Sequence, residues 1–183
     1  QLPIDTPNHF LLNLAPEERA ILEGFFEEQG VAVEALYPMT RGRVLSVNAE
    51  ELPEWREVEG KGVPRQREAN FTWSDSLPEG NLLIDGEWWD AGDTRVWISL
   101  EEGFAQDVGA GLGDRLVVRI GAAELDAAVR SIRQVDWKSM RPNFYVVFPR
   151  PVLEQYPGMY ITSFRLLPNQ KPLLNKMVSV LPT

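Results

Sequence analysis

The most distinct hydrophobic pattern in the chain is an apolar run at residues 144–148, which follows a basic and polar loop and ends at Pro149 and Pro151. Aromatic and β-branched residues bounded by prolines predict a strand that is buried on both faces. Such a strand needs a neighbour on each side, and comparable runs lie near residues 10 and 161. We therefore expect residues 143–148 at the centre of one sheet, built from both ends of the chain.

The first 47 residues have the pattern of a β-α-β unit, with a strand at residues 10–14 and a bent strand over 36–47. Between them, residues 16–29 predict a helix, because proline is tolerated in a first helical turn and Gly30 is a natural C-terminal stop. Its expected inward face consists of four apolar residues at helical spacing: Ile21, Leu22, Phe25 and Phe26.

Residues 48–70 mix charged side chains with glycine and predict a solvated connector, followed by a short strand at 71–73. A small β-rich unit is expected next. Its strands are expected at residues 81–84, 95–98, 115–120 and 125–135. Ser99 with Glu102 has the form of a capping box that opens a short helix. The inward side chains of this helix would be Phe104, Ala105 and Val108.

The end of the chain predicts a short helix over residues 152–156, a strand at 159–164 and a helix from 172. Two β-α-β halves with a β-rich insertion indicate the α+β class. The expected architecture is a split ferredoxin-like domain, formed by residues 1–75 and 137–183, with a small barrel-like unit inserted at 76–136.

Charge and composition exclude several classes of function. The chain of 183 residues has 18 basic and 27 acidic side chains, a formal net charge of -9. An acidic chain gains nothing from a nucleic-acid backbone or from anionic lipid headgroups, so no nucleic-acid partner is expected. The absence of cysteine excludes disulfides and thiolate metal sites. No stretch approaches the ~20 apolar residues of a membrane span, and the two ends predict a part cut from a longer polypeptide.

Two motifs that suggest chemistry have simpler interpretations. His9 is the only histidine, and no acid or nucleophile lies at motif spacing, so we expect a surface or capping role. The glycines 109, 111 and 113 follow a helix and precede a strand, whereas a dinucleotide fingerprint has the reverse order. These glycines therefore predict a helix stop and a tight turn.

Carboxylates gather around Trp88 and Trp89, and two more lie at the start of the expected short helix. They are Asp85, Glu87, Asp90, Asp93, Glu101 and Glu102. Two acids beside aromatic residues suggest sugar hydrolysis, but a solvated, turn-rich loop fits the same residues and is preferred. The spacing does not match a calcium loop.

The densest polar and aromatic group precedes the central apolar run. It consists of Trp137, Lys138, Ser139, Arg141 and Asn143. Ser139 has no histidine or lysine placed as its base. The group therefore predicts an inter-domain hinge or a partner-contact surface, since Arg and Trp are common interface anchors.

Several ordered segments carry a resemblance to a known family. They are residues 7–14, 36–48, 99–105, 112–114, 137–149 and 160–164. In this order they resemble the extracytoplasmic domain of an FtsX-like, or MacB-like, ABC transporter permease. The resemblance covers nearly the whole chain and is weakest at residues 50–75.

The resemblance implies a mixed α/β porter subdomain from residues 1–75 and 137–183 and an inserted β-rich sabre subdomain at 76–136. It implies a parent with transmembrane helices, a separate cytoplasmic ATPase, and mechanical action on a lipid, lipoprotein or protein partner at the periplasmic face of the bacterial inner membrane. The family brings no catalytic, cofactor-binding or metal-ligating residues, so we expect no enzyme activity and no cofactor.

Two other functions remain open from the sequence. One is a free-standing extracytoplasmic module that binds a lipid or another ligand. The other is a secreted carbohydrate-active or esterase-like hydrolase that uses the acids of residues 85–93 or Ser139.

Overall fold

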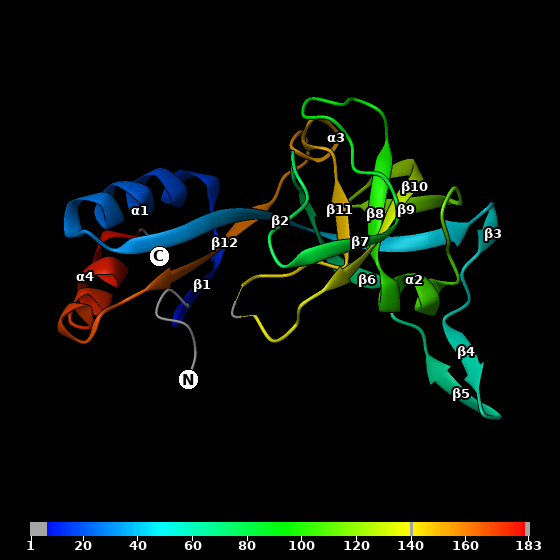
Figure 1. Ribbon diagram of the computed structural model, residues 1–183, viewed down its shortest axis with the longest axis horizontal. Helices are drawn as coiled ribbons and strands as arrows, with labels where there is room; N and C mark the ends of the chain where they lie inside the picture. Colours follow the sequence, from blue (N-terminus) through cyan, green and yellow to red (C-terminus); the bar gives the residue numbers. More distant parts are fainter. Residues whose placement is uncertain (1–6, 140, 182–183) are drawn as a thin grey trace. The chain divides into compact units, whose positions relative to one another are not determined.

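The computed structural model describes residues 7–139 and 141–181, with the backbone alone at residues 10–13 and 34–35. Contacts divide the chain into two units, and Figure 1 labels their elements. The first unit holds the chain up to Met39, residues 137–142 and the chain from Gly158. The second unit holds Thr40–Asp136 and Asn143–Pro157. Each unit has its own hydrophobic core.

The first unit is a three-stranded antiparallel sheet with helices. Its elements are β1 (His9–Leu14), α1 (Pro16–Gln29), the first half of β2 (Ala32–Val47), β12 (Met159–Arg165), the 3-10 helix η1 (Pro168–Gln170) and α4 (Leu173–Val180). β12 lies in the middle and pairs with β1 on one side and β2 on the other. Its core is formed by Leu14, Leu22, Phe26, Val31, Phe164, Leu166 and Met177.

The helix α1 begins and ends as the sequence predicts. Pro16 occupies the first turn, the Glu18 carboxylate accepts a hydrogen bond from the Ala15 amide at 2.8 Å, and Gly30 ends the helix in the left-handed conformation. Leu22 and Phe26 are buried, whereas Ile21 is exposed, so the inward stripe is narrower than expected.

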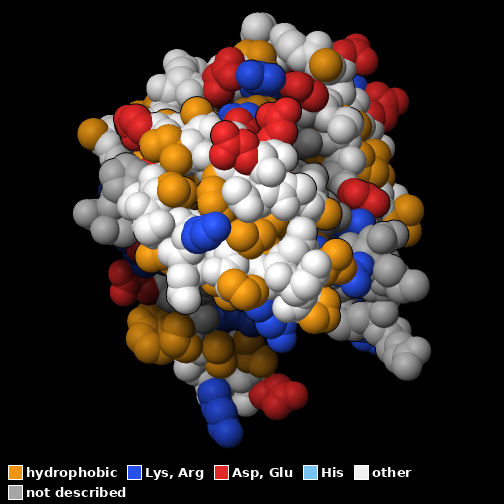
Figure 2. Space-filling view, turned by 90° about the vertical axis from the view of Figure 1, so that its left-hand side faces the viewer, with side chains coloured by type: hydrophobic (Ala, Val, Ile, Leu, Met, Phe, Trp, Pro, Cys, Tyr) orange, Lys and Arg blue, Asp and Glu red, His pale blue; other side chains and the backbone are white. Residues whose placement is uncertain are grey.

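The outer surface near α1 and α4 mixes side chains of different kinds. Figure 2 shows hydrophobic side chains scattered among polar ones on this face, with acidic side chains gathered towards its top. The exposed hydrophobic residues of the first unit include Ile21, Leu167 and Val178. Isolated exposed apolar side chains of this kind are common on protein surfaces.

The second unit is a closed six-stranded barrel. Its strands pair in the cyclic order β2, β6, β11, β8, β10 and β9, because β9 pairs with both β10 and β2. The bounds are β6 (Glu68–Trp73), β8 (Trp97–Glu101), β9 (Arg115–Ile120), β10 (Ala123–Val135) and β11 (Val146–Phe148). Closure removes free sheet edges within the ring.

Smaller elements surround the barrel. They are β3 (Glu50–Glu51), β4 (Trp55–Val58), β5 (Lys61–Pro64), β7 (Asn81–Gly86), α2 (Glu102–Val108) and α3 (Arg150–Leu153). β7 pairs with β10 on the edge opposite to β8, and β4 and β5 form a separate hairpin. The interior is filled by side chains such as Val44, Phe71, Leu100, Val118 and Phe148.

The expected central strand is in the barrel, not in the sheet of the first unit. All three residues of β11 are buried, as the apolar run predicts. However, β11 pairs with β6 in parallel and with β8 in antiparallel orientation, not with β1 or β12. An apolar run specifies burial on both faces but leaves its neighbours open. The first unit accordingly has three described strands, and the expected place of residues 143–148 at the centre of its sheet is wrong. The split ferredoxin-like architecture stays a prediction.

Two local predictions also need correction. The connector at 48–70 contains β3, β4, β5 and the start of β6. Ser99 does not cap a helix, since it is fully buried in β8. Glu101 caps α2 instead, through a carboxylate that accepts a hydrogen bond from the Phe104 amide at 2.8 Å.

The barrel draws in residues from outside the expected insertion at 76–136. Residues 40–75 and 143–157 belong to the second unit by their contacts. The assignment of porter and sabre subdomains to parts of this chain stays a prediction. Within the described residues, no helix has the length and apolar character that crossing a membrane requires.

Candidate functional site

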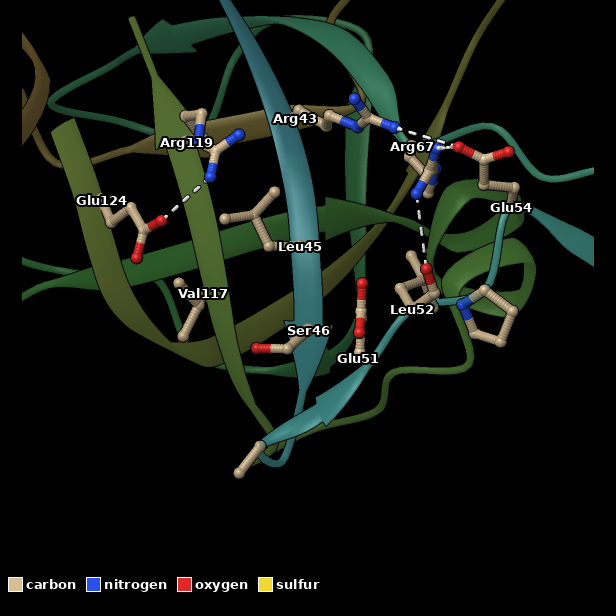
Figure 3. A pocket seen from close by; sticks show the side chains of 12 residues that line it. Arg43, Leu45, Ser46, Glu51, Leu52, Glu54, Arg67, Val117, Arg119 and Glu124 are labelled. Carbon is tan, nitrogen blue, oxygen red and sulfur yellow. Dashed lines mark hydrogen bonds and ion pairs between the residues drawn. The ribbon is translucent and has the colours of Figure 1, made fainter. Parts of the chain in front are cut away.

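The outer wall of the barrel carries a pocket with a volume of about 940 Å³. Alternation along β2 and β9 turns Val44 and Val118 into the barrel and leaves Leu45 and Val117 on the outside. These two outward side chains lie at the floor of the pocket (Figure 3). We call this pocket the barrel groove.

Charged side chains of both signs surround the apolar floor of the barrel groove. They are Arg43, Arg67, Arg119, Glu51, Glu54 and Glu124. Leu52 and Pro53 of the segment after β3 close one side, and Figure 3 shows how strands β2 and β9 carry the other walls. The groove is thus assembled from segments far apart in the sequence.

Five of the six charged side chains of the barrel groove pair with one another. The Glu54 carboxylate accepts a hydrogen bond from Arg67 at 3.1 Å and lies 4.0 Å from the guanidinium of Arg43, while Arg119 and Glu124 pair at 3.1 Å (Figure 3). The Arg119–Glu124 pair is exposed on both sides, and such pairs contribute at most about 1 kcal/mol to stability. A binding partner can therefore displace this pair at low cost.

One donor of the groove is left without a partner. The Nε atom of Arg43 is buried and makes no hydrogen bond within the described part of the chain. The lining contains one hydroxyl, from Ser46, and no histidine, lysine or cysteine that could act as its base. The groove therefore suits binding of a polypeptide segment with an apolar side chain and charges of both signs, rather than acyl transfer.

A projecting hairpin begins directly after Glu54 of the groove. It is formed by β4 and β5 and extends away from the barrel (Figure 1). Trp55 on this hairpin keeps 58% of its surface exposed. Asp107 of α2 holds the base, since its carboxylate pairs with Arg56 at 3.0 Å and accepts from the Gln66 amide at 2.8 Å. A tethered hairpin with an exposed tryptophan is suited to contact a partner.

The two motifs with simple interpretations behave as expected. The ring of His9 stacks on Phe164 with centroids 5.5 Å apart, and its Nδ1 lies 2.6 Å from the side-chain oxygen of Asn8. Gly109 ends α2 in the left-handed conformation, and Gly113 takes a positive φ in the turn before β9. Within the described residues no group of acids and histidine can hold a metal ion.

The acidic loop around the tryptophan pair is a structured turn. Trp88 and Trp89 donate their ring N–H groups to the carbonyls of Asp75 and Ser74 at 3.2 and 2.9 Å. Asp93 forms a two-oxygen pair with Arg95, with a shortest distance of 2.7 Å. Hydrogen bonds from Arg95 lower the pKa of Asp93 to about 2. A glycosidase acid needs a raised pKa, so Asp93 is unsuited to that role.

We expect the Asp93 carboxylate to titrate near pH 2 and to return towards its ordinary pKa of 3.8 when Arg95 is replaced by alanine. Because the folded pKa is below the unfolded value, the pair stabilises the fold above pH 4 and this contribution is lost as the pH falls towards 2. Carboxyl carbon NMR on the chain and on Arg95→Ala measures both midpoints. An unchanged midpoint in the variant would contradict the proposed cause.

The polar group at residues 137–143 lies where the chain passes between the units. Contacts place Trp137 and Arg141 in the first unit and Asn143 in the second. Trp137 and Lys138 are exposed, and Ser139 is partly buried. The position agrees with a connecting segment, and the hinge and partner-contact interpretations of this group stay predictions.

A second polar cluster, which the sequence did not predict, lies inside the barrel wall around Arg133 of β10. This side chain has no exposed surface. It donates hydrogen bonds to the Ser99 hydroxyl at 2.9 Å, to the Asn81 side chain, and to the carbonyls of Phe144 and Tyr145. Burial lowers the pKa of Arg133 to about 10, which leaves it charged at neutral pH. Its partners belong to three other parts of the wall.

The sequence did not predict the residues of the barrel groove as one site, because each lies in a segment that was assigned to a strand, a connector or a hairpin. Arg43 stands in the bent strand, Glu54 and Arg67 in the expected connector, and Arg119 and Glu124 in the expected hairpin. The alternation of side chains at residues 43–47 and 115–119 could have indicated the groove. It marks which positions point outward between the valines and the leucine that point into the barrel.

Comparison with known proteins relates the chain to permeases. It is 38% identical over 165 residues to the uncharacterised ABC transporter permease YbbP of Escherichia coli strain K12, and this match covers 90% of the chain and 20% of the relative. The chain therefore spans about a fifth of the length of that relative. The expected resemblance to an ABC transporter permease is confirmed.

A weaker likeness in structure exists to a solved domain that is described as part of a permease from Porphyromonas gingivalis. The two share 17% sequence identity and a TM-score of 0.38, over 97% of this chain and 78% of that one. A TM-score of this size supports no argument about fold or function. No protein-family model matches the chain.

Proposed function

Since the chain is similar to one region of an ABC transporter permease, we propose that it is a non-enzymatic, extracytoplasmic domain of such a permease. In this role it engages a lipid, lipoprotein or protein partner outside the membrane. The permease would couple that engagement to ATP hydrolysis by a separate cytoplasmic ATPase, through movement transmitted along its transmembrane part. The observation that carries the proposal is the 38% identity over 165 residues.

The geometry of the second unit supports partner binding over catalysis. The barrel groove offers an apolar floor with charges of both signs, and the hairpin next to it presents Trp55. Interfaces of this composition match the common pattern of an aromatic anchor beside arginines. The hydrolase alternative has less support, because Asp93 has a lowered pKa and the loop around it is occupied by structural hydrogen bonds.

The side of the membrane can be tested directly, because the chain has no cysteine. We expect a Glu57→Cys variant of the full-length permease, with cysteines outside the chain replaced, to react with a membrane-impermeant maleimide on intact cells. Glu57 is exposed on the hairpin, so the thiol is accessible to the reagent. The cysteine-free permease is the control for background labelling. Labelling that occurs only after the inner membrane is disrupted would overturn the extracytoplasmic assignment.

Coupling to the ATPase needs a second measurement. The full permease and its ATPase, reconstituted together, should keep basal ATP hydrolysis when Trp55 is replaced by alanine, while stimulation by the extracytoplasmic partner decreases. A turnover of ester or glycoside substrates by the permease would instead support the hydrolase alternative.

A further inference from the structure

The first unit contains a pocket of its own at one end of its three-stranded sheet, with a volume of about 450 Å³. Gly30, which follows α1, forms one side, and η1 contributes Gln170. The beginning of β2 and the end of β12 form the floor, because their antiparallel register places Val33 opposite Phe164 and Ala32 opposite Arg165. We call it the sheet-end pocket, and its volume lies in the range of small-molecule sites, about 300–1,000 Å³.

Most of the wall of the sheet-end pocket is apolar. It includes Pro7, Ala32, Val33 and Leu167, with the buried ring of Phe164 beneath. Leu167 keeps 46% of its surface exposed, although it lines a concave site. Covering such a wall with a hydrocarbon tail would remove apolar surface from water, which is favourable by about 25 cal/mol per Å².

The charged side chains that line the sheet-end pocket are both arginines, Arg141 and Arg165, and no carboxylate lines it. This contrasts with the net charge of -9 of the whole chain and with the paired charges of the barrel groove. Across the described residues, no hydrogen bond or ion pair engages the guanidinium of Arg165, which is half-buried in β12. A guanidinium in this position is available to a ligand.

The frame of the pocket is held by hydrogen bonds that do not involve the arginines. The Gln170 side chain donates to the carbonyl of Gly30 at 3.3 Å and accepts from the Leu167 amide at 3.0 Å. The 3-10 helix is thereby fixed against the end of α1. A pre-formed frame reduces the ordering cost of binding.

We propose that the sheet-end pocket binds an amphiphile with one anionic headgroup, either a carboxylate or a phosphate, and an apolar tail. The planar guanidinium of Arg165 matches both headgroups through parallel N–H donors. Arg141 adds a second positive charge at the same pocket. The apolar wall accepts the first carbons of the tail. This proposal adds to the proposed function the chemical class of a ligand. Only the source of the ligand, outside the membrane, rests on the proposed function.

The test uses the 183-residue chain with four probes, and the three amphiphiles among them are kept below their micellar concentrations. Dodecanoate and dodecyl phosphate carry tail and charge, dodecyl maltoside carries the tail alone, and inorganic phosphate carries the charge alone. We expect saturable binding of the two charged amphiphiles, with shifts of the Gly30 and Gln170 amide signals in NMR spectra. The stronger of the two identifies the headgroup class. If dodecyl maltoside or inorganic phosphate bound as tightly as the charged amphiphiles, the proposal would be overturned. It would also be overturned if the charged amphiphiles showed no saturable binding.

Variants locate the site. Arg165→Gln should weaken the binding of the two charged amphiphiles by about tenfold or more, because a charged hydrogen bond is lost. Leu167→Glu, at an exposed position, should also weaken their binding, because it places a negative charge at the wall of the pocket. Lys176→Gln, on α4 outside the lining, is the matched control and should bind as the original chain does. Equal binding by all variants would overturn the assignment. No membrane or ATPase enters this test, so its failure is distinguishable from failure of the permease proposal.

Discussion

Replacing Arg133 with alanine is expected to destabilise the barrel by roughly 3–5 kcal/mol, the range found when one partner of a buried charged network is removed. The guanidinium is fully buried and donates to Ser99, Asn81 and two backbone carbonyls. Alanine would leave these acceptors buried without their donor, and each unsatisfied group costs about 1–3 kcal/mol. A cavity in place of the side chain adds to the loss.

The cluster also explains why a charge is kept inside the wall. Arg133 on β10 connects to Ser99 of β8, to Asn81 of β7 and to the segment before β11. These hydrogen bonds offset the desolvation that lowers the pKa of Arg133 to about 10, and the Glu101 carboxylate opposes that shift. A single side chain thus connects strands that the chain brings together from distant positions.

Urea unfolding of the chain, followed by tryptophan fluorescence, measures the effect, because five of the six tryptophans belong to the second unit. Arg130→Ala on the same strand is the matched control. Arg130 is partly exposed and pairs with Glu87 at 2.7 Å, so its removal should cost less than about 1 kcal/mol. A similar, small loss for both variants would show that the buried hydrogen bonds do not hold the wall together.

The helices were predictable because their signals are local. Pro16, the apolar spacing and Gly30 define α1 within fifteen residues, and the structure places its ends where these residues predict. The hairpin at Gly121, between β9 and β10, is similarly local, since glycine provides the positive φ that the turn requires. Signals of this kind do not depend on how the remainder of the chain folds.

Strand pairing was harder to predict, because it depends on partners far away in the sequence. The run at β11 has the composition of a buried strand in either unit, and its true neighbours β6 and β8 lie about 75 and 45 residues earlier along the chain. β6 itself begins inside a charged stretch that has the composition of a connector. The alternating pattern therefore indicated the strands, but not the ring that joins them.

The candidate sites were the least predictable part. Arg133 stands in β10 among residues such as Ser131 and Gln134 that are typical of a strand with one solvated face. Only the packing of β7 and β8 beside it shows that its position is buried. The sequence likewise does not show that Arg165 lines a pocket together with Gln170 and Gly30. These residues are far apart in the sequence, and the fold at the end of α1 brings them together.

The substitution Gly42→Ala adds one methyl group and is expected to lower the stability of the barrel by at least about 2 kcal/mol. This is the second largest loss of stability that we expect, after that of Arg133→Ala. Gly42 lies in β2 opposite Ala69 of β6, and an added Cβ would overlap the ring of Phe71. That ring has no exposed surface and packs on Phe148 with centroids 5.5 Å apart. The buried ring would have to shift against its neighbours, and overpacking of this kind is destabilising.

The matched control for Gly42→Ala is the same substitution at Gly24, on the exposed side of α1. An added Cβ there meets no atom within 4 Å. Because alanine favours the helix, Gly24→Ala should stabilise the first unit by roughly 0.5–1 kcal/mol. Urea unfolding of both variants gives the two differences with opposite signs. If Gly42→Ala were neutral, the contact between β2 and the Phe71 ring would have to be looser than the structure shows, and the closure of the barrel between β2 and β6 would need another explanation.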